Sequence, residues 1–480
     1  MLTGKALAKS RLGRDDTQPA MGSELTPTQS SFRDPAGCFV LEEERGLRTV
    51  KSEFARDTLA FLGSDVAKKW TTQGRLIASE VLDEPVPGLS LRLAHPRIFF
   101  PSYAWEWTAA QLEAAAELTL DLCEDLIGSG WILKDATPSN ILFDGPRPVF
   151  VDVLSVERRD PEDPLWNAYG QFVRTFLLPL AALRSLGWSL SSTLSRRDGY
   201  EPEELYSVLG PVQRLRSPWR SLVTLPVLLS RRTTAGQARR MHRPAPVALK
   251  ILGHTLRSLR RSLRSLSRTA GESRWSRYRE NVAHYSTEDW KRKTDFVQEA
   301  LTLAQPRHVL DIGANTGVFS RLAAASGARV VAWDADMSAT ERAWRDVCEG
   351  PADVLPLVAE FARPTPAAGW NNTETLSLLD RSRGRFDMVM MLAVLHHLLV
   401  RDQIPMEHIA RLTREMANGW LLVEWVGPKD TKFQELSNGR DWLYGGLNEE
   451  QFAASFSSYF VPVRRAVLSN ERVLCLMKVK

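Results

Sequence analysis

From about Ser286 to the C-terminus, the sequence alternates between short apolar runs and segments with helical periodicity. Two of the apolar runs, 386–394 and 420–426, are apolar almost throughout, which is typical of strands buried on both faces. Strands that alternate with helices indicate βα units, and these build a parallel, doubly wound sheet. The sequence therefore predicts an α/β domain over 285–480 with a Rossmann-like sheet.

The chain has 480 residues, which exceeds what one hydrophobic core normally organises, so we expect several units. Residues 1–36 open with a polar stretch rich in Ser, Thr, Gln and Pro, and we expect them to be disordered. Residues 37–230 mix strand-like runs with helical ones, which predicts an accessory α+β domain. Residues 231–284 are predicted to form a basic helical connector.

Apolar periodicity gives the expected elements of each domain. In the accessory domain these are a hairpin at 38–51, helices at 53–70 and 109–128, a strand at 74–83 and a mainly helical region at 165–230. In the C-terminal domain we expect helices at 288–304 and 316–326. The expected strands there are 308–313, 328–334, 354–360, 386–394 and 420–426, with a closing pair at 461–467 and 471–479.

The connector concentrates positive charge. Residues 231–280 contain thirteen arginines and one lysine but only two acidic residues. Along 247–269, leucines recur at steps of three and four, which places them on one face of a helix with arginines on the others. Two interpretations stay open: the leucines pack on a domain, or the helix contacts a membrane surface or another anionic partner. Nucleic acid is not the expected partner, because aromatic residues do not interleave with these arginines.

One motif in the C-terminal domain points to a bound ligand. The run 309–317, VLDIGANTG, leaves a buried strand, turns tightly and enters a helix. Gly313 and Gly317 let the backbone approach a ligand closely, and the free amides that begin the helix suit a carboxylate. Asp311 lies two residues before the first glycine, where it would repel a pyrophosphate but would attract a ligand that carries an ammonium and a sulfonium.

Two further acids end the next strands. Asp334 is placed to accept the hydroxyl groups of a ribose, and Glu360 is placed to accept from an adenine amino group. This series of a glycine turn and acids at successive strand ends resembles the class I S-adenosylmethionine-dependent methyltransferases. The resemblance covers roughly 285–480 and departs from the family at Glu360, where Asp is more usual. It implies S-adenosylmethionine as cofactor, bound by Asp311, Gly313, Asn315, Gly317, Asp334 and Glu360.

The implied reaction is in-line transfer of a methyl group to an acceptor that the sequence does not identify, through an oxygen, nitrogen or carbon atom. An oxygen acceptor needs a general base. His396 and His397 follow the fourth strand, and Glu424 lies inside an apolar strand, where a carboxylate needs a partner. We take His397 and Glu424 as the catalytic candidates, with structural roles as the alternative.

A second cluster of polar residues lies in the accessory domain. Asp135 and Asn140 share one loop, and Asp152 follows a short predicted hairpin. This pattern resembles the catalytic centre of kinase-like and aminoglycoside-phosphotransferase-like folds, where the first Asp orients the acceptor hydroxyl and the other two residues hold magnesium. The sequence departs from it because residues 37–100 contain no glycine-rich loop and Lys51 is only a loose match to the nucleotide lysine.

These features leave three functions open. The methyltransferase is the leading one, and the two halves together resemble bacterial two-domain proteins described as nodulation-type or generic methyltransferases. The alternatives are a phosphotransferase centred on Asp135, Asn140 and Asp152, and a non-catalytic scaffold that keeps both folds. Independently of the function, a structural role stays open for the three polar residues, in which they only cap turns.

The cysteine content and the lack of long apolar runs indicate the compartment in which the protein is expected. The four cysteines lie far apart in the sequence, which fits a reducing compartment and argues against a structural zinc site, so no metal is expected. The chain has no run of eighteen apolar residues, and its first residues lack the apolar core of a secretory signal. We therefore expect a cytoplasmic protein, and its oligomeric state is not readable from the sequence.

Overall fold

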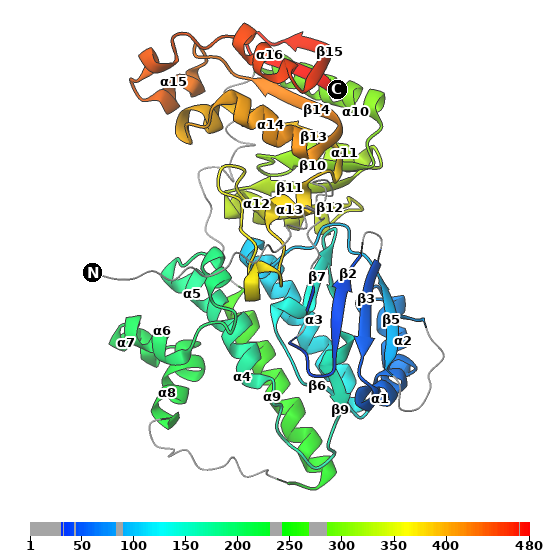
Figure 1. Ribbon diagram of the computed structural model, residues 1–480. Helices are drawn as coiled ribbons and strands as arrows, with labels where there is room; N and C mark the ends of the chain where they lie inside the picture. The colour runs from blue at the N-terminus through cyan, green and yellow to red at the C-terminus, as the bar shows by residue number, and fades with distance from the viewer. Residues whose placement is uncertain are drawn as a thin grey trace, which may run out of the picture.

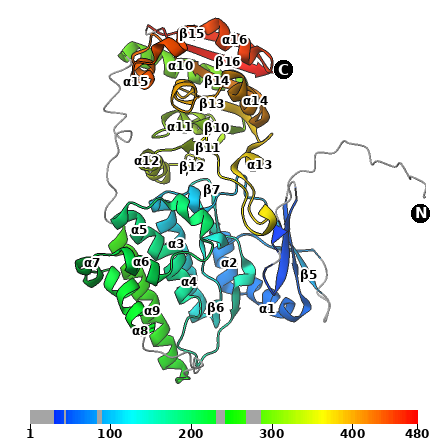
Figure 2. The same cartoon turned by 60° about the vertical axis from the view of Figure 1, so that its left-hand side comes forward.

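The computed structural model describes residues 30–31, 33–42, 45–82, 90–230, 242–267, 286–469 and 471–480. Within these residues the chain forms two halves, one above the other in Figures 1 and 2. Most of the N-terminal segment that we expected to be disordered lies outside the described residues, as do parts of the connector, 231–241 and 268–284. The expected disorder does not extend to residue 36, because Ser30–Ser31 form a strand that pairs with a neighbouring strand.

The C-terminal half is built on a seven-stranded sheet in which four neighbouring pairs are parallel and the last two are antiparallel. In spatial order the strands are β12 (Val354–Val358), β11 (Arg329–Asp334), β10 (His308–Ile312), β13 (Phe386–Met391), β14 (Ala417–Trp425), β16 (Val473–Val479) and β15 (Phe460–Val467). The predicted doubly wound sheet with an antiparallel end is therefore confirmed. The connections between its strands are α10 (Thr287–Ala304), α11 (Val318–Ala325), α12 (Met337–Cys348), η7 (Trp370–Asn372), α13 (Leu378–Ser382), η8 (His397–Arg401), α14 (Met406–Met416), α15 (Thr431–Ser437), η9 (Asp441–Tyr444) and α16 (Glu449–Ser457).

Alternate residues of the strands fill two different cores, because successive side chains of a strand point to opposite faces. Val309 and Met388 pack in the core that contains residues of α10 and α11. Leu310 and Val389 pack in the other core, which contains residues of α14 and α16. This double burial explains why the central strands read as nearly continuous apolar runs.

The accessory half combines an antiparallel sheet with a helical part. The sheet has the order β1 (Ser30–Ser31), β2 (Gly37–Leu41), β3 (Arg45–Val50), β5 (Leu91–Pro96) and β4 (Glu80–Val81). Two short strand pairs follow, β6 (Trp131–Leu133) with β9 (Val156–Arg158), and β7 (Ile141–Asp144) with β8 (Arg147–Phe150). The helices are α1 (Ser52–Leu62), α2 (Asp65–Thr72), η1 (Ala104–Glu106), α3 (Ala109–Gly128), η2 (Pro138–Asn140), η3 (Val153–Ser155), α4 (Tyr169–Phe172), η4 (Val173–Leu177), α5 (Leu178–Leu186), η5 (Leu190–Ser195), α6 (Pro202–Val208), α7 (Pro211–Leu215), η6 (Arg220–Thr224), α8 (Leu225–Ser230) and α9 (Ala245–Leu266).

Two sequence predictions in this half need correction. The expected strand at 74–83 is reduced to the two residues of β4, because Leu76 instead bridges to Phe150 of β8. The single helix expected at 53–70 is two helices, since Gly63 ends α1 and the side chain of Ser64 caps α2. By contrast, α3 has the predicted bounds, 109–128, and Thr108 and Gln111 form a capping box at its start.

Helix α9 carries the leucine seam of the basic connector. Leu252, Leu256 and Leu259 are buried, and α9 packs against α3, whereas Leu249 at the start of the seam is 37% exposed. On α3, Asp121 and Glu124 accept hydrogen bonds from Arg260. Most of the seam is therefore covered by the accessory half. Among the described helices, none has both the length and the apolar character needed to span a bilayer.

The accessory half packs against the edge of the large sheet where the parallel strands begin. Phe99 stacks on His308, the first residue of β10, with ring centroids 4.3 Å apart. Arg329, the first residue of β11, pairs with Asp144 at 3.2 Å. The side chain of Gln111 donates to the carbonyl of Pro356 in β12 at 3.0 Å. The carboxyl ends of the strands, where α/β proteins bind ligands, lie at the opposite edge.

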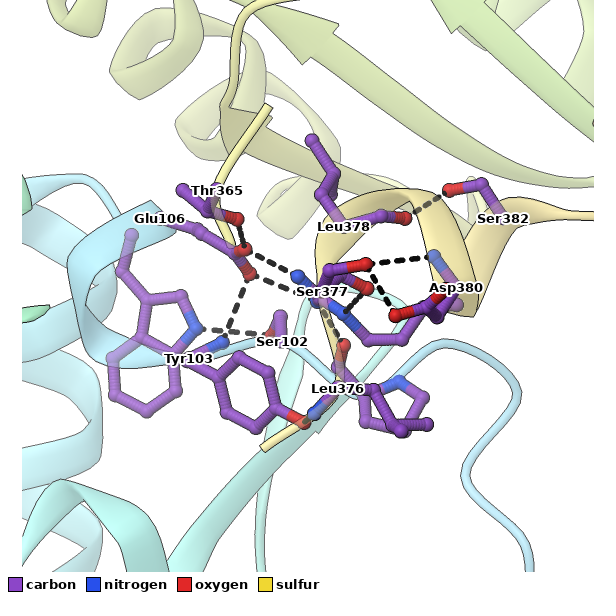
Figure 3. Close-up of polar contacts among 12 residues, drawn as sticks. Ser102, Tyr103, Glu106, Thr365, Leu376, Ser377, Leu378, Asp380 and Ser382 are labelled. Carbon is purple, nitrogen blue, oxygen red and sulfur yellow. Dashed lines mark hydrogen bonds and ion pairs between the residues drawn. The ribbon is translucent and has the colours of Figure 1, made fainter. Parts of the chain in front are cut away.

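A buried ion pair joins the two halves at this interface. Glu106 of η1 and Arg381 of α13 form two hydrogen bonds, and both residues are almost fully buried. The hydroxyl of Thr365 also donates to the carboxylate of Glu106, as Figure 3 shows. Tyr103 accepts a hydrogen bond from the backbone of Leu376 at 3.2 Å, and its ring lies beneath the guanidinium of Arg381. Each charged group therefore has a partner in the other half.

We predict that Arg381→Met strongly destabilises the protein, because it leaves the carboxylate of Glu106 buried without its cation. The expected loss is about 3–5 kcal/mol in the free energy of unfolding, measured by urea denaturation. Arg383→Met is the matched control, because Arg383 is half exposed in its ion pairs and is expected to contribute less than about 1 kcal/mol. Equal losses in the two variants would contradict this account of the interface.

Candidate functional site

The glycine turn lies between β10 and α11 and has an unusual backbone. Gly313 and Gly317 have φ values of 73° and 70°, and Asn315 between them has a φ of 51°. A side chain at 313 would lie 2.9 Å from Val394, so the position has no room for a Cβ atom. Left-handed conformations favour glycine and, to a lesser degree, asparagine. The sequence motif is therefore explained by the shape of this turn.

Asp311 lies directly beneath the turn and is 2% exposed. The hydroxyl of Ser320 in α11 donates a hydrogen bond to its carboxylate at 2.6 Å. Burial raises the pKa of Asp311 to about 6, and the nearby charge of Asp334 contributes in the same direction. The carboxylate is thus held in a low-dielectric position where a cation would be strongly attracted.

Asp334 ends β11, next to the glycine turn. Its carboxylate accepts hydrogen bonds from the backbone amides of Asn315 and Asp336, both at 2.8 Å. Burial raises the pKa of Asp334 despite these bonds. The neighbouring Asp336 has a different task, because its side chain accepts from the backbone amides of Ser338 and Ala339 and so caps α12. Because Asp336 is used as a helix cap, Asp334 is the acid at this strand end that can face a ligand.

Glu360 lies two residues beyond the end of β12, so the predicted strand 354–360 ends earlier than expected. The side chain of Arg363 donates a hydrogen bond to its carboxylate at 2.7 Å. Strands β10, β11 and β12 are neighbours and run parallel, so Asp311, Asp334 and Glu360 follow one edge of the sheet. The structure thus brings together the turn and the three acids that the sequence singled out.

The two candidate histidines lie just after β13. Ala393 before them has a φ of 57°, a strained conformation of the kind that clusters at functional sites. His396 is 3% exposed, whereas His397, the first residue of the π-helical turn η8, is partly exposed. Burial lowers the pKa of His397 to about 4, and the charge of Arg401 lowers it further. His397 is therefore a neutral imidazole at pH 7.

Glu424 lies inside β14 and is fully buried. Lys293 of α10 donates a hydrogen bond to its carboxylate at 2.6 Å, and Arg472 lies 3.5 Å from it. Both cations are themselves about 97% buried. Burial lowers the pKa of Lys293, while Glu424 acts in the opposite direction. The catalytic role expected for Glu424 stays a prediction, and its carboxylate has two buried cationic partners.

Sequence reasoning missed the residues that support this site. Lys293 and Ser320 lie on α10 and α11, and Arg472 lies beside β16. A lysine on the apolar face of a predicted helix was a usable signal for Lys293, since a buried ammonium requires a carboxylate partner. Ser320 and Arg472 had no comparable signal, because nothing in the local sequence indicates their distant partners.

The polar cluster of the accessory half is also brought together. Asp152 pairs with Arg48 of β3 and accepts a hydrogen bond from Ser155. Asn140 donates to Ser155 at 3.0 Å and to the backbone oxygen of Asp135 at 3.3 Å. The basic residue that meets this cluster is therefore Arg48, and the suggested Lys51 is exposed. In the part of the chain that the structure describes, no three His, Cys, Asp or Glu residues form a group that would hold a metal ion.

Comparison with known proteins agrees with the geometry of the C-terminal half. Residues 278–459 match a family described as a methyltransferase domain. The chain is 30% identical to the nodulation protein NoeA of Rhizobium meliloti (strain 1021) over 451 residues, which are 89% of this chain and 90% of that protein. The chain belongs to the family of this nodulation protein. It is an S-adenosylmethionine-dependent methyltransferase, with S-adenosylmethionine as its cofactor.

Solved structures similar to the chain include two methyltransferases. The N-methyltransferase NodS from Bradyrhizobium japonicum WM9 is 13% identical and covers 40% of this chain and 98% of its own, with a TM-score of 0.31. Magnesium protoporphyrin IX methyltransferase from Synechocystis PCC 6803 is 17% identical and covers 40% and 84%, with a TM-score of 0.30. At scores this low, these likenesses carry no conclusion about substrate or mechanism.

The raised pKa of Asp311 gives a pH-dependent prediction. The folded state holds this proton up to about pH 6, whereas the unfolded state releases it near pH 4, so stability falls as the pH rises between these values. We therefore expect Asp311→Asn to be more stable than the native protein at pH 7, by up to about 3 kcal/mol. The advantage should shrink as the pH falls from 6 to 4. Urea denaturation at pH 4.5 and pH 7 measures the stability difference between the variant and the native protein at each pH. A variant less stable than native at pH 7 would contradict the raised pKa of Asp311.

Proposed function

We propose that the glycine turn and the three acids at the carboxyl edge of the sheet hold S-adenosylmethionine for transfer of its methyl group to an acceptor. The observation that carries this proposal is the edge itself, where Asp311, Asp334 and Glu360 follow three adjacent parallel strands. A ligand with a cationic amino-acid end, a ribose and an adenine presents matching groups in that order. When bound, the sulfonium supplies the activated methyl group.

The residues present fit this cofactor. The positive φ of Gly313 and the lack of space for a Cβ keep the backbone open toward the ligand. Asp311 would attract the ammonium, and the first amides of α11 would receive the carboxylate. Asp334 keeps acceptor capacity on both oxygens, since each oxygen receives one backbone amide, and so can accept the ribose hydroxyls. Glu360 would accept from the adenine amino group.

For an acceptor that must lose a proton, we assign the general base to His397. Its imidazole is neutral at pH 7 and partly exposed, so an acceptor can reach a ring nitrogen that carries no proton, and its lowered pKa makes it a weaker base than free histidine. We assign Glu424 a supporting role, because its carboxylate is fully buried and already paired with Lys293 and Arg472, so an acceptor cannot reach it. In this role Glu424 fixes α10 against β14 behind the glycine turn.

The phosphotransferase alternative receives no support from the contacts of its residues. That reaction needs Asn140 and Asp152 as magnesium ligands. Here one carboxylate oxygen of Asp152 is bonded to Arg48 and the other to Ser155, while Asn140 donates only through its amide nitrogen, to Ser155. Contact of α9 with an anionic surface also stays a proposal. Its exposed arginines 257, 261 and 264 leave it open, although its leucines are largely covered.

We predict that Asp334→Ala weakens binding of S-adenosylmethionine by about 10- to 100-fold, because two hydrogen bonds from ribose to a carboxylate are lost. Isothermal titration calorimetry of the intact protein measures the dissociation constant. Asp295→Ala is the matched control, since Asp295 lies exposed on α10 in an ion pair with Lys291. An unchanged dissociation constant in Asp334→Ala would exclude the proposed ribose contact.

We also predict that His397→Gln lowers the rate of methyl transfer by about 100-fold or more, as loss of a general base does. Binding of S-adenosylmethionine should change less than about threefold, since hydrogen bonds to the cofactor are not expected from this side chain. The assay follows labelled methyl groups from S-adenosylmethionine into a cell extract that supports transfer by the native protein. Full activity of His397→Gln in that assay would show that the acceptor needs no base at this position.

A further inference from the structure

The accessory half contains a cavity of about 560 Å³ that takes no part in the proposed methyl transfer. Its walls come from the inner face of the five-stranded sheet, from the loop with Asp135 and Asn140, and from the segment 368–375 of the methyltransferase half. In that segment Ala368 and Thr375 pair as an antiparallel bridge. Figure 2 shows it in yellow, reaching from the methyltransferase half toward the blue strands. The cavity therefore lies at the amino edge of the large sheet, away from the glycine turn.

His95 gives the clearest indication that this cavity receives a ligand. The residue lines the cavity and is 4% exposed. Its Nδ1 lies 3.1 Å from the carbonyl oxygen of Ala78, which can only accept, so the ring proton is on Nδ1. Nε2 is then a bare acceptor, and among the described residues it has no hydrogen-bond partner. Burial lowers the pKa of His95 to about 4, so the ring stays neutral. Nε2 can then accept a hydrogen bond from a donor group of a ligand.

Other polar atoms of the cavity wall are hydrogen-bond donors without an acceptor among the described residues. The buried Nε of Arg48 and Nε1 of Trp105 have no partner within the described structure, and the same holds for the hydroxyl of Thr375. All three residues line the cavity. Buried polar atoms without partners are costly, and a set of them around one cavity indicates a ligand that supplies the missing bonds. That ligand must offer donors and acceptors within a short distance of each other.

The charge of the wall limits the class of ligand. Five arginines and five carboxylates line the cavity, so the positive and negative charges balance. A triphosphate needs an excess of positive charge or magnesium. The carboxylate of Asp152 is already neutralised by Arg48, and Asp135 would repel a phosphate group. The rings of Phe39, Tyr103 and Trp105 add flat apolar surface to the same wall.

We propose that this cavity is a second binding site and that it takes a neutral, hydroxyl-rich ring compound, a sugar or a nucleoside without phosphates. A hydroxyl group can donate to Nε2 of His95 and accept from Arg48 or Trp105. The carboxylate of Asp135 accepts from a further hydroxyl, and Thr375 brings the methyltransferase half into contact with the ligand. The compound bound here is distinct from S-adenosylmethionine, whose proposed residues lie at the opposite edge of the sheet.

Calorimetry of the full-length protein with three probes tests this proposal. Cellobiose represents the sugars, adenosine represents the nucleosides, and ATP with magnesium represents the phosphorylated class. We expect saturable binding of cellobiose or adenosine, and the one that binds identifies the source of the ring. Tighter binding of ATP with magnesium than of adenosine, lost in Asp152→Ala, would overturn the proposal. If neither cellobiose nor adenosine bound at millimolar concentration, the proposal would be overturned as well.

Two variants locate the binding. Thr375→Val removes a hydroxyl that has no hydrogen-bond partner among the described residues, so the fold should not suffer, and Asp135→Asn keeps the shape of the side chain. We expect each to weaken binding of the neutral probe by about three- to tenfold, the effect of one hydrogen bond. Thr302→Val, on the exposed face of α10, is the matched control and should leave it unchanged. Equal binding by all three variants would place the probe elsewhere and contradict the proposal.

Discussion

The ion pair between Glu106 and Arg381 is the interaction on which the arrangement of the two halves depends. Two opposite charges withdrawn from water are tolerated only when their geometry and hydrogen bonds are complete, and here Thr365 and the carbonyl of Pro101 complete the set. Partners on both sides of the interface specify one mutual orientation. That orientation places the accessory half at the amino edge of the large sheet and leaves the carboxyl edge to the cofactor.

At the carboxyl edge, the chemistry follows from burial. Asp311 and Asp334 are held where a carboxylate is poorly solvated, so each has a raised pKa and gains from a cation or a hydroxyl donor. Behind them, Lys293 pairs with Glu424, and Arg472 pairs with Asp430 and lies near Glu424, so two cations face two carboxylates. The pair of Lys293 and Glu424 joins α10 to the sheet. The apolar core thus carries a small ionic cluster beside the site. This cluster supports the glycine turn and leaves Asp311 and Asp334 available to the ligand.

The sequence predicted the methyltransferase half well, because its signals are local. Alternating apolar runs gave the strands, and the spacing of Asp311, Gly313 and Gly317 gave the turn. The accessory half was predicted less well, since its polar residues act over long separations. Arg48 forms an ion pair with Asp152, and Glu106 forms one with Arg381, which lies 275 residues further along the chain. A buried charge signals that a partner exists, but only the fold identifies the partner.

The central claim is that the glycine turn and its three acids form the methyl-donor site. The most direct measurement is a crystal structure of the full-length protein with S-adenosylhomocysteine, the product of the donor. We expect density above Gly313, with the ribose at Asp334, the adenine beside Glu360 and the amino-acid end near Asp311. Density for the product at any other place, with an empty carboxyl edge, would contradict the claim.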